Sequence, residues 1–156
     1  MQEQDVMDLK IPKIEVLVDI MFIDREQVAE EFYLYLNHFS PLHKGEQTLE
    51  EFINSDELFI PAKKSLNREF QILNNQSIIY IKEKNRAEES PGASIHIHLR
   101  NSQDIEIELF ELLPDFHSRP IDFFNNPRTF LPFIHDRARI YINKNHILRA
   151  SENEQR

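Results

Sequence analysis

Cysteine is absent from the 156-residue chain, and the only glycines are Gly45 and Gly92. Without cysteine the chain has no disulfide, no thiolate nucleophile and no cysteine-ligated zinc. With two glycines it cannot build the usual phosphate-cradling turns of P-loops and dinucleotide-binding folds. No apolar run is long enough to cross a bilayer, and the acidic start is not followed by an apolar signal run. We therefore expect a soluble, cytoplasmic protein.

The residues that are abundant favour a β-rich core. Twelve phenylalanines and a hydrophobic share of 40% provide enough apolar surface for a core built from short strands. The net charge of −9 opposes binding to phosphate backbones and to anionic membranes. We expect no membrane contact and no cofactor.

One stretch of the chain occurs twice. Residues 49–61 read LEEFINSDELFIP, and residues 120–132 read PIDFFNNPRTFLP. At a spacing of 71 residues, four identities align: Phe52 with Phe123, Asn54 with Asn125, Phe59 with Phe130 and Pro61 with Pro132. A second block, residues 72–79, matches residues 141–148 at a spacing of 69. Such a repeat predicts a tandem duplication.

The predicted fold class is α+β and mostly β, with antiparallel sheets. Each unit is predicted to contain two strands, a short helix and two more strands, and the two units to be related by pseudo-two-fold symmetry. The first unit spans 13–82, a charged linker containing Pro91-Gly92 spans 83–94, and the second unit spans 95–150. Because each unit is small, we expect the two to bury apolar surface against each other.

Short-range signals place the helices and turns. Thr48 followed by Glu51 is a capping box that starts a helix. Asn54 and Asn125 stand where the helices should end, and asparagine tolerates a left-handed backbone there. The closing hairpins, at about 66–81 and 137–150, should turn at Asn74-Asn75 and Asn143-Lys144 with positive φ. The repeated phenylalanines Phe52, Phe59, Phe123 and Phe130 are predicted core residues.

The pattern His96-Ile97-His98 places two imidazoles on one face of a strand, and Glu106 and Glu108 alternate in the same way on the next strand. An odd loop, Asn101-Ser102-Gln103, would pair His98 with Glu106 and His96 with Glu108. These four side chains could hold a zinc, manganese or iron ion. A solvated sheet face with opposite-charge pairs, each contributing about 0.2–1 kcal/mol, explains the same pattern, and we favour that interpretation.

Two further sets of residues are candidate binding surfaces. Tyr33 and Tyr35 point outward from their strand, and exposed aromatic residues favour contact with a partner. Arg139, Tyr141 and Lys144 in the last hairpin combine cations with a stacking surface that could bind single-stranded nucleic acid. No Ser–His–Asp order or HExxH spacing links the histidines, so no catalytic residue is predicted.

The second copy carries a family resemblance. Its sequence DFFN…FLPF…YINKNHI, within residues 120–150, resembles the closing phrase DFLN…FIPL…LVNKDHI of a small, functionally uncharacterised bacterial domain family. The resemblance implies no activity. The strand–turn–strand rhythm is also similar to the closing hairpin of Sm-like small barrels. Residues 142–148 lack the Arg-Gly or Lys-His signature that those barrels use at their RNA site.

Three functions follow as hypotheses. The first is a non-enzymatic protein-interaction or regulatory module whose partner is another protein. The second is a small barrel that binds nucleic acid. The third is a metal-dependent enzyme that uses His96 and His98.

Overall fold

The computed structural model describes residues 13–25, 28–110 and 120–152. The first half contains β1 (Lys13–Phe22), β2 (Glu30–Asn37), α2 (Leu49–Ile53), β3 (Phe59–Lys64), β4 (Phe70–Asn74), the 3₁₀ turn η1 (Asn75–Ser77) and β5 (Ile78–Arg86). The second half contains β6 (Pro91–Leu99), β7 (Asp104–Phe110), α3 (Pro120–Phe124), β8 (Phe130–His135), β9 (Ala138–Asn143), the 3₁₀ turn η3 (Lys144–His146) and β10 (Ile147–Glu152). In these ranges no helix has the length and apolar character needed to span a membrane.

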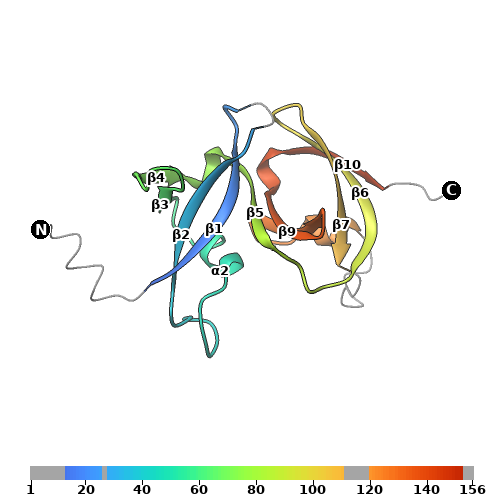
Figure 1. The fold of residues 1–156 in the computed structure, drawn as a ribbon. Coiled ribbons are helices and arrows are strands. Elements are labelled where there is room, and N and C mark those ends of the chain that lie inside the picture. The colour runs from blue at the N-terminus through green and yellow to red at the C-terminus, as the bar shows by residue number, and fades with distance from the viewer. Residues whose placement is uncertain (1–12, 26–27, 111–119, 153–156) are drawn as a thin grey trace, which may run out of the picture.

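The described strands form one open antiparallel sheet in the order β10-β6-β7-β8-β9-β5-β1-β2-β3-β4, so the predicted mostly-β, antiparallel class is confirmed. The sheet curls into two lobes, one for each half, and the lobes meet where β5 lies beside β9 (Figure 1). This junction joins the fourth strand of the second half to the fifth strand of the first. A two-fold axis at the junction would pair like strands, so the predicted pseudo-two-fold symmetry does not describe this contact.

Alternation along the strands decides which side chains enter the core. In β2, Phe32, Leu34 and Leu36 are buried, while Tyr33 and Tyr35 on the other face are partly exposed. This alternation follows the two-residue period of a strand, and the predicted inward and outward faces of β2 are confirmed.

The predicted capping box is confirmed at the start of α2, where the Glu51 backbone N–H donates to the Thr48 hydroxyl and the Thr48 backbone N–H donates to the Glu51 carboxylate. The prediction that α2 ends at Asn54 is confirmed, because Asn54 is the C-cap of the helix, but its φ of −99° is not left-handed. Its side chain instead reaches the second half: Nδ2 donates to the Phe130 carbonyl oxygen at 3.1 Å, and Oδ1 accepts from the Phe130 backbone N–H at 2.8 Å.

The predicted closing hairpins are also wrong. β4 pairs with β3, whereas β5 pairs with β1 and β9, and η1 joins β4 to β5 without a tight hairpin turn. Asn74 and Asn143 have φ values of −84° and −68°. Each caps the following 3₁₀ turn, because its side chain accepts a hydrogen bond from a backbone N–H two residues ahead.

Much of the segment predicted as a linker is part of the sheet. Residues 83–86 belong to β5 and residues 91–94 belong to β6, so residues 87–90 alone connect the two strands.

The two halves share their cores. The core of the first half, built around Val18, Ile20 and Ile81, also contains Phe130 and Tyr141 from the second half. The core of the second half contains Met21 and Ile79 from the first. Each half therefore completes the apolar interior of the other.

The matching phenylalanines do not share one environment. Phe130 is fully buried, but Phe59 is 52% exposed, so the prediction that Phe59 belongs to the core is wrong. Phe130 lies at the junction between the halves, whereas Phe59 lies on β3, near the end of the sheet. Phe52 and Phe123 are partly buried against their own cores.

Candidate functional site

The His-x-His strand pairs in a register that differs from the predicted one by two residues. His96 lies opposite Glu106, His98 opposite Asp104, and Ser94 opposite Glu108. The turn decides this register, because Leu99 and Gln103 close it through a 2.8 Å backbone hydrogen bond and Ser102 supplies a left-handed residue, with φ of 72°. The loop keeps an odd number of residues, so both histidines and the glutamates still share one face.

The carboxylate beside the two histidines is Asp104, which the sequence interpretation missed. Asp104 Oδ1 bonds to His98 Nδ1 and lies 3.7 Å from His96 Nε2. The hydrogen bond from His98 lowers the pKa of Asp104. Glu106 accepts a 2.7 Å hydrogen bond from the Ser94 hydroxyl. Among the described residues, no three His, Asp or Glu side chains are grouped as metal ligands, so His96, His98, Glu106 and Glu108 are not assembled into a site.

The candidate nucleic-acid residues are engaged within the protein. The Arg139 guanidinium pairs with the Glu89 carboxylate, and its Cζ lies 5.1 Å from the centre of the Phe110 ring. The hydrogen bond to Arg139 lowers the pKa of Glu89. The Lys144 ammonium donates to the Asn126 carbonyl oxygen. Arg139 and Lys144 therefore already have partners from their own chain.

Tyr141, predicted to offer a stacking surface, is 1% exposed and cannot do so. Its ring packs in the core of the first half, and its hydroxyl donates to Glu83 Oε2 at 2.6 Å. Burial and the Glu83 hydrogen bond raise the pKa of this phenol. Tyr141 is buried because β9 pairs with β5 at the junction, where the ring enters the core of the first half.

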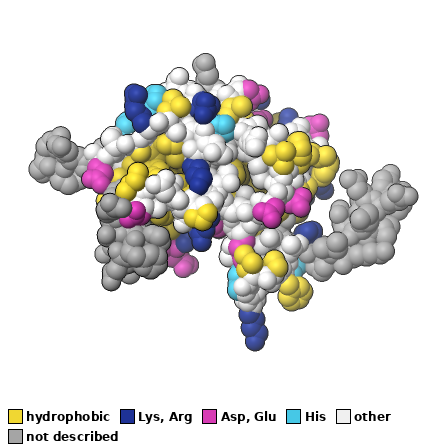
Figure 2. Space-filling model, turned by 180° about the vertical axis from the view of Figure 1, so that it is seen from behind, with side chains coloured by type: hydrophobic (Ala, Val, Ile, Leu, Met, Phe, Trp, Pro, Cys, Tyr) yellow, Lys and Arg dark blue, Asp and Glu magenta, His cyan; other side chains and the backbone are white. Residues whose placement is uncertain are grey.

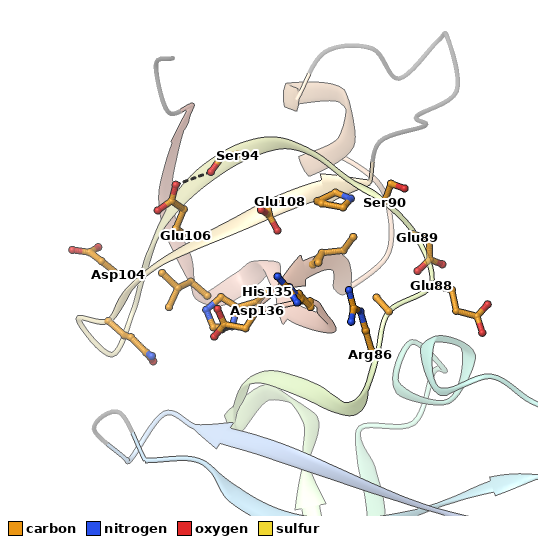
Figure 3. A pocket seen from close by; sticks show the side chains of 16 residues that line it. Arg86, Glu88, Glu89, Ser90, Ser94, Asp104, Glu106, Glu108, His135 and Asp136 are labelled. Carbon is orange, nitrogen blue, oxygen red and sulfur yellow. Dashed lines mark hydrogen bonds and ion pairs between the residues drawn. The ribbon is translucent and has the colours of Figure 1, made fainter. Parts of the chain in front are cut away.

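A cleft with a volume of about 1080 Å³ opens over the outer face of the second half. Figure 3 shows Asp104, Glu106 and Glu108 on one wall and His135 and Asp136 below them, with Arg86 at the end of β5 and Glu88 and Glu89 on the β5–β6 connection. Carboxylates outnumber cations along this lining. The cleft is open to solvent, and its ionic groups pair locally: the Lys82 ammonium, for example, lies 3.7 Å from Asp136.

His135, at the end of β8, is the histidine of this cleft. Burial lowers its pKa, and the Lys82 ammonium, whose Nζ lies 2.8 Å from His135 Nδ1, lowers it further. The Asp136 carboxylate, 3.7 Å away, opposes both effects. The folded protein therefore favours neutral His135.

We expect His135→Asn to reduce the loss of stability on acidification. Since the folded pKa lies below the unfolded value of about 6.5, the stabilisation is complete above pH 6.5 and is lost as the pH falls toward the folded pKa. Melting temperatures measured between about pH 7.5 and 5.5 should therefore fall more steeply in the wild type than in the variant.

His43→Asn is the matched control, because the Lys44 carbonyl and Glu51 raise the pKa of His43 and reverse the sign. Identical pH profiles for the wild type and His135→Asn would contradict the assignment of neutral His135.

Tyr33 and Tyr35 form part of the outer face of the first half, as predicted. The Arg68 guanidinium covers the Tyr33 ring at 4.7 Å. The Tyr35 hydroxyl donates to Glu15 at 2.9 Å, and burial together with this bond raises the pKa of Tyr35 to about 12. Both rings are held in place while remaining partly exposed.

This outer face continues into an apolar patch that the sequence interpretation missed. Paired residues of an antiparallel ladder share a face, so Pro61 and Ile72, which lie opposite each other, are on the same side as Phe59 and Phe70. Phe59 is 52%, Phe70 47% and Ile72 65% exposed. We call these four residues the β3–β4 patch. Figure 2 shows hydrophobic side chains gathered at the end of the molecule where β3 and β4 lie.

A signal for the patch is present in the sequence. Phe70, Ile72 and Leu73 put apolar side chains on both faces of β4. A strand with apolar side chains on both faces is expected to be buried on both faces, whereas β4 is buried on one face and exposed on the other.

Comparison with known proteins finds no matching family model, no matching curated protein and no matching solved structure.

Proposed function

We propose that the protein is a non-enzymatic protein-interaction module that arose by tandem duplication and binds protein through the β3–β4 patch. The observation that carries the proposal is the exposure of Phe59, Phe70 and Ile72 together on one face of the terminal hairpin. Large apolar side chains that adjoin one another at the surface mark interaction sites, whereas scattered ones do not. The neighbouring Tyr33 and Tyr35 add partly exposed aromatic surface of the kind enriched at interfaces.

The pairing of the strands supports the duplication. In each half the first strand pairs with the second and the fifth, and the third strand with the second and the fourth. Equivalent residues occupy equivalent positions: Phe59 lies opposite Asn74, and Phe130 lies opposite Asn143. The two asparagines cap η1 and η3 in the same way. The same ladder appears twice with different side chains on its outer face.

The other two hypotheses have less support. A nucleic-acid site at the last hairpin lacks its stacking surface, because Tyr141 is buried and Arg139 is paired with Glu89. A metal-dependent reaction lacks a ligand group among the described residues. We therefore propose no second function.

Site-specific photo-crosslinking in cells tests the interaction. We expect a photoreactive phenylalanine analogue at position 72, in the patch, to form covalent adducts with protein. The same analogue at position 42 is the control, because Leu42 is also exposed but lies outside the patch. Adducts that form equally at both positions, or at neither, would overturn the proposed function.

A further inference from the structure

Among the described strands, the sheet has one internal junction and two edges, and the edges match the junction. The junction pairs a fourth strand, β9, with a fifth strand, β5. The edges are the remaining fourth strand, β4, and the remaining fifth strand, β10. Each edge strand has a ladder neighbour on one side, so its other side can template another strand.

Two side chains of the second half seal the internal junction. Phe130 and Tyr141 enter the core of the first half, and Tyr141 lies opposite Ile81 in the β5–β9 ladder. In the repeat, the counterparts of Phe130 and Tyr141 are Phe59 and Ile72. Both counterparts are apolar and exposed, and both belong to the β3–β4 patch. The patch therefore contains the counterparts of the two side chains that fill the core at the junction.

A surface that could bind Phe59 and Ile72 lies at the other edge of the sheet, beside β10. A mostly apolar hollow of about 360 Å³ opens between α3 and β10. Its lining includes Ile95, Phe124, Ile147 and Ala150. By the repeat and the strand pairings, these residues correspond to Val18, Ile53, Ile78 and Ile81. All four of those belong to the core that takes up Phe130 and Tyr141.

The asparagine that forms hydrogen bonds across the junction also has a counterpart at the edges. Asn54 holds both backbone groups of Phe130. Asn125, the counterpart of Asn54, is exposed at the end of α3, on the same half as the hollow. Phe59, the counterpart of Phe130, is on the half that carries the patch. Asn125 of one molecule could therefore bind the backbone of Phe59 in a second molecule, as Asn54 binds that of Phe130.

One pair of substitutions between the copies fits an intermolecular contact. At the junction, Glu50 of α2 lies 3.9 Å from Arg139 of β9. The repeat replaces Glu50 with Ile121 and Arg139 with Phe70. Ile121 is 56% exposed, so an ion pair has been exchanged for two exposed apolar side chains, one at each edge. Contact between the two side chains would be favourable in free energy, because burial removes apolar surface from water.

We propose that the partner of the β3–β4 patch is a second copy of this chain, bound head to tail through its β10 hollow. This rests on the proposed function and names the partner of the same site. β4 of one copy pairs with β10 of the next in the register of the internal junction, with Ile72 opposite Ala150. Phe59 and Ile72 fill the hollow, and Asn125 holds the backbone of Phe59. Because unlike surfaces meet, the contact repeats from copy to copy and forms a ring or a filament.

Two charged variants of the purified full-length protein test this. Ile72→Glu blocks the patch, and Ala150→Glu blocks the hollow; both side chains are exposed in the single chain. Light scattering after gel filtration should show the wild type above the mass of one chain and each variant at that mass. Leu42→Glu, an exposed apolar position outside both surfaces, should assemble as the wild type does.

A mixture decides the orientation. The Ile72→Glu protein retains its hollow and the Ala150→Glu protein retains its patch, so the two should form a complex of one copy each and grow no further. If Ala150→Glu lowers the melting temperature, Leu148→Glu places the charge at another exposed residue of β10. A wild type that is monomeric at every concentration, or variants that assemble unchanged, would overturn the second-copy proposal. Adducts at position 72 with another protein would, in that case, leave the proposed function standing.

Discussion

Phe130→Ala should lower the free energy of unfolding by about 3–5 kcal/mol, which is a large part of the stability of a domain of this size. Phe130 is fully buried in the core of the first half although it belongs to β8 of the second. Removing its ring leaves a cavity at the junction and weakens the packing of both halves. Chemical denaturation monitored by circular dichroism measures the loss.

Phe59→Ala is the matched control, because it makes the same substitution at the counterpart position. Phe59 is 52% exposed, so in the dilute single chain we expect a cost below about 1 kcal/mol. Equal losses in the two variants would mean that the two phenylalanines are equally buried, which would contradict the exposure difference at the junction.

A chain divided between residues 86 and 91 should yield two fragments that do not fold alone. The first fragment loses Phe130 and Tyr141 from its core, and the second loses Met21 and Ile79. The β5–β9 ladder is also lost, so each fragment exposes an additional unpaired strand. Fragments of this size are marginal even with a complete core. Thermal melts of the separate fragments should lack a cooperative transition.

Mixing the two fragments should restore a cooperative transition, since all the strands of the junction are then present. A fragment that melts cooperatively as a monomer would show that its half has a sufficient core of its own, and would separate the two halves as independent domains.

Features with a short-range cause could be predicted from the sequence. The capping box at Thr48 depends on residues three apart, and the alternation of β2 depends on the two-residue period of a strand. The odd β6–β7 loop followed from the same alternation. The alternation did not predict the register of the β6–β7 pair. The left-handed backbone of Ser102 shifted the turn, so that Asp104, and not Glu106, lies opposite His98.

The sequence by itself determined a mostly-β chain, the inward and outward faces of β2, and the repeated positions Phe59 and Phe130. Only the tertiary structure decided that Phe130 is buried and Phe59 exposed, that Tyr141 is a core residue, and that Asn54 binds the backbone of Phe130. The physical reason is that the halves join through unlike strands, β9 and β5. Local propensity is the same for a residue in either copy, but its burial depends on which edge of the sheet another strand covers.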